Sequence, residues 1–482
     1  MTQLFRYWAC GLIFIASCFF SNCANIVPPG GGPRDTIPPV LVDVYPLDSS
    51  LHFKSKKVTF HFNEYVELDN IIDKMIVSPT LKRTPNVVAK LRTITMEIKD
   101  TLEANTTYTF HFADAVKDVN ERNPIEDFQY VVSTGDYLDS LNISGKLVVA
   151  ETGKVDSNVA VMLYRHTMDS VVSKEKPVYY AKSKGDGSYR FKNLAPGTYK
   201  LFALKEEDRD LQYTQPTELI GFADSLIHLS TQNLKDVDLL LFAEADTTLI
   251  KKPDENAAEA EPEKKDKDKK KPRLYVSAAL EGGQQELTGP LLMTFTIPIK
   301  SLDSTQMELT EDTLFTPVPF THSFDSTRTK LSIFYKWKEG TPYRLITAKT
   351  APTDTLDQQL TKADTTAFIS KKRNDYGKIQ ISLTISDSTK NANHSDSLKY
   401  IVQLVKDKEI KYTGDVSKGI WKQELLQPGE YEIRLLIDEN GNGKWDRGVY
   451  YGSPKKQPER VVSYPNKINL KANWGVNEKI AI

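Results

Sequence analysis

A run of oxygen-bearing side chains in the last fifth of the chain has the composition of a calcium loop. Oxygen ligands stand at positions one, three, five and nine of this run: Asp438, Asn440, Asn442 and Asp446. Calcium takes carboxylate and amide oxygens at such alternate positions around a glycine turn, which Gly443 supplies at position six. Position twelve is Val449 in place of the usual glutamate, so we expect a modest affinity.

A simple turn also fits these residues. The run contains two Asn-Gly pairs, which commonly form β-hairpin turns without any ligand. An earlier copy of the segment, Lys205–Tyr213, has lost the alternating spacing, and we expect no metal there. No cofactor is required by any other motif, so calcium is the single candidate ligand.

The cysteines point to a different chemistry, that of lipid attachment. All three lie near the start of the chain, at Cys10, Cys18 and Cys23. The apolar stretch over residues 7–21 is too short to span a bilayer, which takes roughly 20 residues, and its layout predicts a secretory signal peptide over residues 1–22. A chain cut before Cys23 keeps one cysteine and forms no internal disulfide.

Cys23 resembles the modified cysteine in the lipobox of bacterial lipoproteins. Such a cysteine becomes the new N-terminus and carries acyl chains, and more than one chain gives a durable membrane anchor. Residues 15–18 end in Cys18 and also resemble a lipobox, so Cys18 stays an alternative to the preferred Cys23. The Pro- and Gly-rich residues 23–37 then predict an extended tether.

Motifs of common enzymes are missing from the sequence. It contains no Gly-x-Ser-x-Gly elbow, no His-Glu-x-x-His pair and no phosphate loop. His61 and His111 stand at polar positions of predicted strands, where a solvated role is the default. We assign no catalytic residue and expect that the protein is not an enzyme. The alternative, a glycan-directed hydrolase, needs two carboxylates about 5–9 Å apart, and 64 acidic residues leave no pair singled out.

Charge gives no sign of a nucleic-acid partner. The formal net charge is -1 over 482 residues. Nucleic-acid binding usually needs a clustered basic surface, and the lysines of Glu263–Lys271 are interleaved with acidic residues. This charged stretch belongs to a linker, residues 246–272, which has too little apolar surface to fold.

The rest of the chain is dominated by period-two alternation of apolar and polar residues. Apolar side chains recur at every second position, as in Val58, Phe60 and Phe62 and in Tyr108, Phe110 and Phe112. Such alternation predicts strands with one buried face, and frequent turn residues favour an all-β fold of tandem antiparallel sandwiches.

An internal repeat links the two sides of the linker. Three segments recur in the same order at nearly the same offset: Val58–Phe62 in Met293–Ile297, Asn105–Phe112 in Gly340–Thr347, and Asn193–Leu204 in Leu425–Leu436. The sequence therefore predicts two copies of a two-sandwich unit. The predicted domains are residues 38–136, 141–245, 273–372 and 375–482. We expect cleavage in the linker to give two halves that melt independently.

Residues 38–136 resemble the bacterial Ig-like domains of surface-layer proteins. The motifs are PPVLVDVYP, VTFHFNEYV, LEANTTYTF and FQYVVSTGD, in that order. Residues 273–372 keep FTIPI and GTPYRL but lack a counterpart of Asn63 and Glu64, so they are expected to be a degenerate second copy.

Residues 141–245 and 375–482 resemble transthyretin-like, carboxypeptidase-regulatory sandwiches. The motif is KGDGSYRFKNLAPGTYKLFAL in the first copy and LLQPGEYEIRLL in the second. Pro196 and Gly197 predict a type II turn. Beyond it Tyr199, Leu201 and Ala203 are expected to face the core.

The combination resembles a class of Ig-like lipoproteins of Gram-negative bacteria. That resemblance implies an outer-membrane protein, lipid-anchored on the periplasmic face or the cell surface, with a non-catalytic structural or binding role. Its expected partners are the membrane, through the anchor, and an envelope protein or glycan. An accessory carbohydrate-binding protein is, with the hydrolase, the alternative.

A tripeptide of Asp, Ser or Thr and a following apolar residue recurs along the chain. Examples are Asp35–Ile37, Asp100–Leu102, Asp139–Leu141, Asp224–Leu226, Asp312–Leu314, Asp354–Leu356 and Asp396–Leu398. It resembles the O-glycosylation acceptor motif of some Gram-negative envelope proteins. The same residues also form side-chain turns at strand ends, so both interpretations stay open.

Overall fold

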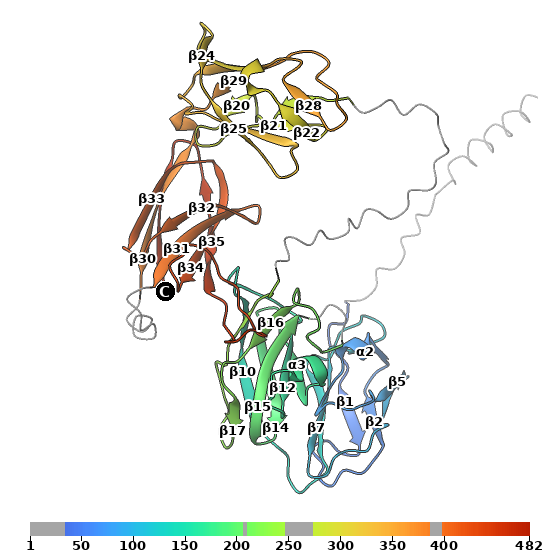
Figure 1. The fold of residues 1–482 in the computed structure, drawn as a ribbon. Coiled ribbons are helices and arrows are strands. Elements are labelled where there is room, and N and C mark those ends of the chain that lie inside the picture. The colour runs from blue at the N-terminus through green and yellow to red at the C-terminus, as the bar shows by residue number, and fades with distance from the viewer. Residues whose placement is uncertain (1–33, 206–209, 246–272, 386–397) are drawn as a thin grey trace, which may run out of the picture. The chain divides into compact units, whose positions relative to one another are not determined.

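The computed structural model describes residues 34–205, 210–245, 273–385 and 398–482, and these are almost entirely β-strands (Figure 1). The predicted signal peptide, Cys18, Cys23 and the linker 246–272 lie outside the described residues, as does most of the tether. Within the described part, no helix has the length and apolarity needed to cross a membrane. The boundary between two compact units falls between Ser140 and Leu141, and Asn193–Ala195 belongs with the first unit.

The first sandwich shows the predicted alternation. Its sheets run β1-β2-β6-β5 and β4-β7-β9, with a ribbon of β3 and β8. Phe60 is fully buried and meets the rings of Phe112 and Tyr130 edge-on, at centroid distances of 5.5 and 5.4 Å. The elements are β1 (Leu41–Tyr45), β2 (Lys57–Phe62), β3 (Val66–Leu68), α2 (Ile71–Lys74), β4 (Ile76–Ser78), β5 (Asn86–Lys90), β6 (Thr93–Glu97), β7 (Thr107–Ala113), β8 (Val116–Asp118) and β9 (Phe128–Ser133).

The second sandwich pairs a sheet β11-β10-β14, in which β18 lies parallel to β10, with a sheet β13-β12-β15-β16. Tyr199, Leu201 and Ala203 are buried, as predicted. The elements are β10 (Leu141–Val149), β11 (Lys154–Val155), β12 (Ala160–Tyr164), α3 (Val171–Lys174), β13 (Tyr179–Lys182), β14 (Ser188–Leu194), β15 (Gly197–Lys205), β16 (Leu219–Phe222), β17 (Ile227–Leu229) and β18 (Leu239–Leu241).

The turn before β15 differs from the prediction. Gly197 is already the first residue of β15 rather than the corner of a type II turn. The positive φ falls instead on Asn193, at 55°. Asparagine tolerates this left-handed conformation, and Asn193 adopts it next to the last residue of β14.

The third sandwich has sheets β19-β21-β26-β25 and β20-β29-β27-β23-β24, and a ribbon of β22 and β28. Trp337, Tyr343 and Phe368 pack together in its core, with ring centroids 5.1 to 5.6 Å apart. The elements are β19 (Val276–Ala278), β20 (Gln284–Gln285), β21 (Leu291–Phe295), β22 (Ile299–Leu302), η2 (Ser304–Gln306), β23 (Met307–Glu311), β24 (Thr316–Val318), β25 (Thr321–Phe324), β26 (Lys330–Phe334), β27 (Pro342–Thr347), β28 (Pro352–Asp354) and β29 (Asp364–Ser370).

The fourth sandwich has sheets β33-β30-β36 and β32-β31-β34-β35. Tyr431, Ile433 and Leu435 of β34 are buried in its core. The elements are η3 (Arg373–Asp375), β30 (Gly377–Thr384), β31 (Lys399–Lys406), β32 (Glu409–Asp415), β33 (Ile420–Leu426), β34 (Gly429–Asp438), β35 (Arg460–Leu470) and β36 (Gly475–Ala481).

Strand pairing repeats along the chain. In the first and third sandwiches, β2 pairs with β6 as β21 pairs with β26, and β7 pairs with β9 as β27 pairs with β29. In the second and fourth, β12 pairs with β15 as β31 pairs with β34. The first strand of each of these two sandwiches also lies parallel to its last, β10 to β18 and β30 to β36. The sequence repeat therefore has a counterpart in topology.

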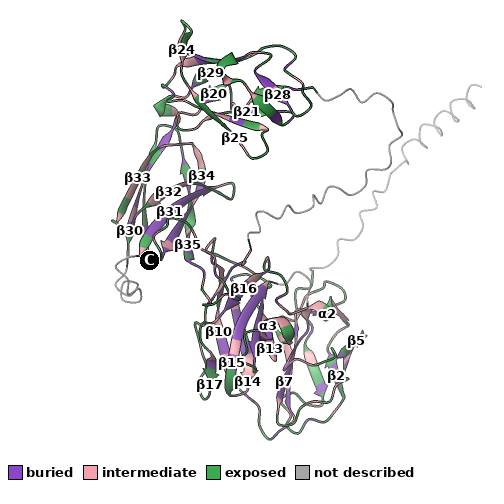
Figure 2. Ribbon diagram, viewed as in Figure 1, coloured by how far each residue is buried: buried purple, intermediate pink, exposed green. Residues whose placement is uncertain are grey.

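Two sheets are buried on both faces, which simple alternation does not predict. All five residues of β12 are buried, and six consecutive residues of β31 are buried (Figure 2). One face of each sheet meets its own sandwich core. The other face needs a second cover, and the loop between β34 and β35 supplies part of it.

Candidate functional site: the loop between β34 and β35

The predicted calcium residues lie in one loop that leaves β34 at Asp438 and returns at Arg460, the start of β35. Asp438 is the last residue of β34 and is fully buried. The loop therefore starts from a carboxylate that water does not reach, which must be satisfied by donors of the protein.

Backbone N–H groups of the loop satisfy Asp438. Its Oδ1 accepts hydrogen bonds from the N–H groups of Gly441 at 2.6 Å and Asn442 at 3.2 Å, and its Oδ2 accepts one from Gly443 at 2.8 Å. Gly441 and Gly443 have φ near 75°, the left-handed region that glycine enters readily. The Asn-Gly pairs thus wrap the chain around the Asp438 carboxylate.

The three other predicted residues meet beside this turn. Oδ2 of Asp446 accepts hydrogen bonds from the side-chain amides of Asn440 and of Asn442, the latter at 3.1 Å. Oδ1 of Asn440 accepts from the Asn442 N–H at 3.0 Å. The structure therefore brings all four predicted residues together, and donors of the loop form hydrogen bonds to at least one side-chain oxygen of each.

Glu459 completes the loop and was missed in the sequence. It is 1% exposed. Its Oε1 accepts a hydrogen bond from the Glu439 N–H at 3.0 Å and its Oε2 one from the Asp446 N–H at 3.0 Å. Burial raises the pKa of its carboxyl, and the nearby carboxylates of Asp446 and Asp438 raise it further. It stands far beyond position twelve, so loop spacing gives no signal for it.

The carboxylates and imidazoles of the described residues do not gather into a metal cluster. Across the ranges that the structure describes, no three His, Cys, Asp or Glu side chains converge as ligands for a metal ion. Calcium in this loop stays a prediction. Part of the comparison segment, residues 206–209, lies outside the described residues, so the expected absence of a site there also stays a prediction.

The loop next packs onto its own sheet through Trp445. This side chain lies against Ile401, Leu436 and Val461, which form a row across β31, β34 and β35. Its indole N–H donates a 2.7 Å hydrogen bond to the Glu459 carbonyl. The second buried face of this sheet is therefore covered in part by the loop that follows β34.

Further along the same loop, Tyr450 packs into the second sandwich instead of the fourth, to which the loop belongs. It is fully buried in a cluster with Phe202, Phe222 and Phe242 of the second sandwich. Its ring meets Phe202 at 5.4 Å and Phe222 at 5.1 Å between centroids. The same loop thus contains both the predicted polar residues and an aromatic residue, Tyr450, that is buried in the second sandwich.

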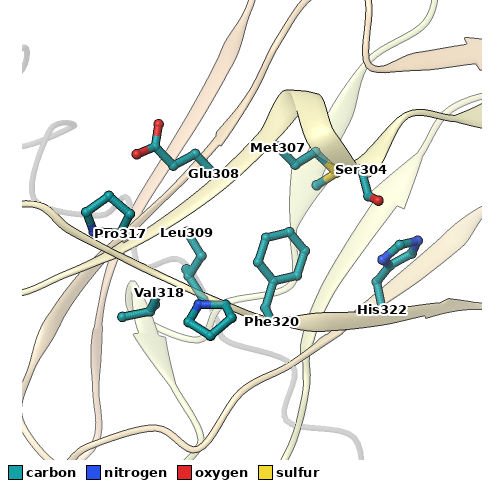
Figure 3. Close-up of a pocket in the computed structure, with 9 residues that line it drawn as sticks. Ser304, Met307, Glu308, Leu309, Pro317, Val318, Phe320 and His322 are labelled. Carbon is teal, nitrogen blue, oxygen red and sulfur yellow. The ribbon is translucent and has the colours of Figure 1, made fainter.

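A cavity of about 400 Å³ lies in the third sandwich, between β23 and the segment that joins β24 to β25 (Figure 3). Its walls combine apolar residues, including Leu309, Val318 and Phe320, with the polar Ser304, Glu308 and His322. Glu308 and His322, its ionisable residues, lie at opposite ends with Phe320 between them.

Several of the Asp-Ser/Thr tripeptides form the side-chain turns that the sequence offered as one interpretation. The aspartate Oδ1 accepts a hydrogen bond from the N–H two residues on in three of them: Asp35 to Ile37 at 2.9 Å, Asp312 to Leu314 at 2.7 Å and Asp354 to Leu356 at 2.8 Å. The intervening Thr36, Thr313 and Thr355 are exposed. Each turn therefore holds a hydroxyl residue at the surface.

Comparison with protein families identifies one part of the chain. Residues 35–134 match the family model described as bacterial Ig-like domain. This confirms the resemblance predicted for the first sandwich. No curated protein matches the chain.

Solved structures show only weak overall likeness to this chain. BcpA, the major pilin subunit of Bacillus cereus, is 10% identical, with 71% of this chain and 99% of that chain covered and a TM-score of 0.16. The N-terminal part of the bacterial S-layer protein SbsC is 15% identical, with 44% and 45% covered and a TM-score of 0.15. Native alpha-2-macroglobulin from Escherichia coli, spanning domains MG0-NIE-MG1, is 12% identical, with 40% and 70% covered and a TM-score of 0.20. Likeness at these scores carries no inference about function.

Proposed function

We propose that the chain is a lipid-anchored protein of the bacterial cell envelope with a non-catalytic, structural or binding role. The observation that carries this proposal is that the buried carboxylates of the candidate site bind backbone N–H groups of the loop. Asp438 and Glu459 accept hydrogen bonds from backbone N–H groups on both of their oxygens, so they hold a loop. The same loop places Tyr450 in the core of another sandwich. The polar groups of the loop therefore have a structural role.

The bacterial Ig-like match of residues 35–134 supports a place in the envelope, because it agrees with the resemblance of the same residues to surface-layer domains. The anchor is supported by the sequence around Cys23. We place the protein on the outer membrane, at its periplasmic face or on the cell surface, with an envelope protein or glycan as partner.

Metabolic labelling with an alkyne fatty-acid analogue tests the anchor. We expect the wild-type chain to be labelled and to fractionate with outer membranes. Cys23→Ser should remove the label and release the chain, whereas the matched Cys18→Ser variant should keep both. Label lost only in Cys18→Ser would move the anchor to Cys18. An unlabelled wild-type chain would overturn the lipoprotein assignment.

Incubation with purified envelope glycan tests the non-catalytic role against the hydrolase alternative. The soluble Cys23→Ser chain should release no new reducing ends. A second measurement, co-sedimentation with the insoluble glycan, separates a glycan partner from a protein partner. Release of reducing ends that scales with protein concentration would show an enzyme and contradict the proposal.

A further inference from the structure

The second sandwich has an aromatic acceptor site on the outer face of its sheet β13-β12-β15-β16. Phe202 of β15, Phe222 of β16 and Phe242 line it, and they are 0%, 5% and 1% exposed. Tyr450 fills this site and is 0% exposed, although it belongs to the loop after β34. A buried aromatic side chain contributes the largest share of such a contact, because it removes the most apolar area from water.

Polar groups fix Tyr450 in place. Its hydroxyl donates a 2.6 Å hydrogen bond to the carbonyl of Asp169. Its backbone N–H donates a 2.6 Å hydrogen bond to Oε1 of Glu244. Every donor that Tyr450 buries therefore has an acceptor in the second sandwich, which is the condition for burying a polar aromatic residue at low cost.

The flanking residues extend this contact. Gln457 donates from its side-chain amide to the Phe222 carbonyl at 2.9 Å and to the Asp224 carboxylate at 2.8 Å. Gly448 passes so close to Phe242 that a Cβ at this position would lie 2.6 Å from the ring. Such an approach admits only glycine without a shift of the ring.

A second contact lies where β10 ends. The Val461 N–H donates a 3.0 Å hydrogen bond to the Ala150 carbonyl. Lys154 pairs with Glu432 of β34 at 2.8 Å. Between them Gly153, with φ 67°, approaches Val461 and Ser463 so closely that a Cβ would lie 2.5 Å from the Ser463 nitrogen. Backbone, ion-pair and aromatic contacts thus join the same two sandwiches.

We propose that residues 448–457 are a clasp that makes the second and fourth sandwiches one cooperative unit, which survives cleavage of the linker between them. The proposal goes beyond an envelope role and does not depend on the anchor. It opposes the expectation of halves that melt independently. That expectation rested on the charged composition of residues 246–272 and took no account of residues distant in sequence.

The test uses the full soluble chain with a site-specific protease sequence inserted in residues 246–272. After cleavage we expect both fragments to elute from a sizing column together, at the volume of the uncut chain. The second and fourth sandwiches should also melt in one shared transition. Wild-type fragments that separate at micromolar concentration, or that melt at unrelated temperatures, would overturn the clasp.

Tyr450→Ala should weaken fragment association by at least about a hundredfold, because it empties an aromatic core position. Tyr431→Ala is the matched control, since Tyr431 is buried within the fourth sandwich itself. It should lower the temperature of the shared transition but leave the cut fragments together. Equal separation in the two variants would mean general unfolding and would contradict a specific clasp.

Gly448→Ala gives a second measurement that does not depend on removing a core side chain. The added methyl meets Phe242 only when the clasp is docked, so association should weaken while each fragment stays folded. Gly289→Ala is its control, because the nearest atom to a Cβ there is 3.9 Å away. Unchanged association in Gly448→Ala would count against the docked geometry.

Discussion

The backbone N–H of Tyr450 and the carboxylate of Glu244 form a 2.6 Å hydrogen bond between the fourth and the second sandwich. The same oxygen accepts the Tyr451 N–H at 3.2 Å, and the other oxygen accepts the Tyr213 hydroxyl at 2.6 Å. One carboxylate therefore satisfies three donors at the base of the clasp.

Removing the Glu244 carboxylate should destabilise the unit that the second and fourth sandwiches form. Glu244→Ala leaves N–H groups of Tyr450 and Tyr451 without their acceptor, and we expect a loss of about 1–3 kcal/mol. Glu244→Gln keeps one acceptor oxygen and should cost less. Urea unfolding followed by tryptophan fluorescence measures both variants. The control Glu409→Ala removes a side chain that is 73% exposed and should change stability by no more than about 0.5 kcal/mol. A Glu244→Ala effect no larger than this control would contradict the assigned role.

The clasp should weaken in acid through Asp169. Hydrogen bonds from Lys200 and then Lys455 hold the pKa of its carboxyl below the ordinary value of 3.8. The stabilising contribution is therefore present above that ordinary value and is lost as pH falls through the lower folded-state pKa. The carboxylate is 56% exposed, so solvent screening keeps the effect small.

Melting temperatures measured from neutral to strongly acidic pH check this dependence. Asp169→Asn removes the charge and should flatten the acid limb of the curve relative to the wild-type chain. Asp186→Asn is a useful comparison, since the lowered pKa of Asp186 comes first from the Ser188 hydroxyl, outside the clasp. A wild-type curve that Asp169→Asn leaves unchanged would remove Asp169 from the acid response.

Calcium binding in the loop that begins at Asp438 is tested by neutralising one carboxylate, with the length of the loop unchanged. About millimolar calcium should raise the melting temperature of the full chain if the oxygens turn from their N–H partners to the ion. Asp446→Asn keeps the loop length and should remove the shift. Asp156→Asn, in a surface ion pair with Lys205, should leave it intact. The absence of any calcium-dependent shift would leave the loop as the turn that its hydrogen bonds already form.

Glycosylation of the Asp-Ser/Thr tripeptides is tested by intact mass. The exposed Thr313 and Thr355 lie in aspartate side-chain turns and are the positions where we expect an added sugar. Thr313→Val and Thr355→Val should each remove one increment of mass from the native protein. A native mass equal to that of the polypeptide without any sugar would rule out glycosylation of the tripeptides.

Sequence patterns predicted those parts of the fold that depend on near neighbours. Alternation gave the strands around Phe60, and the motif near Tyr199 gave its buried face. The opposite face of the same strand, with Phe202 and Leu204, is also buried. A continuous apolar run signals that a cover exists. It cannot identify Tyr450 as the cover, because that contact joins residues far apart in sequence.

The residues of the candidate site also divide into four that local spacing predicted and one, Glu459, that it did not. Local spacing brought together Asp438, Asn440, Asn442 and Asp446, since a loop of this length must fold back on itself. Glu459 is also part of the loop, but the segment between it and Asp446 is used to reach the second sandwich. Its position follows from where β35 begins, which no spacing rule within the loop contains.

The parallel pairing of the first and last strands of the fourth sandwich has a mechanical consequence. β30 and β36 align over seven residue pairs, from Lys378 with Gly475 to Thr384 with Ala481. Tension applied at the start of β30 and the end of β36 would pull these neighbours in opposite directions along their length. The hydrogen bonds between the two strands would then be loaded in shear and would have to break together, instead of opening one after another. A sandwich loaded in this direction resists stretching more than one in which the same number of bonds open in sequence.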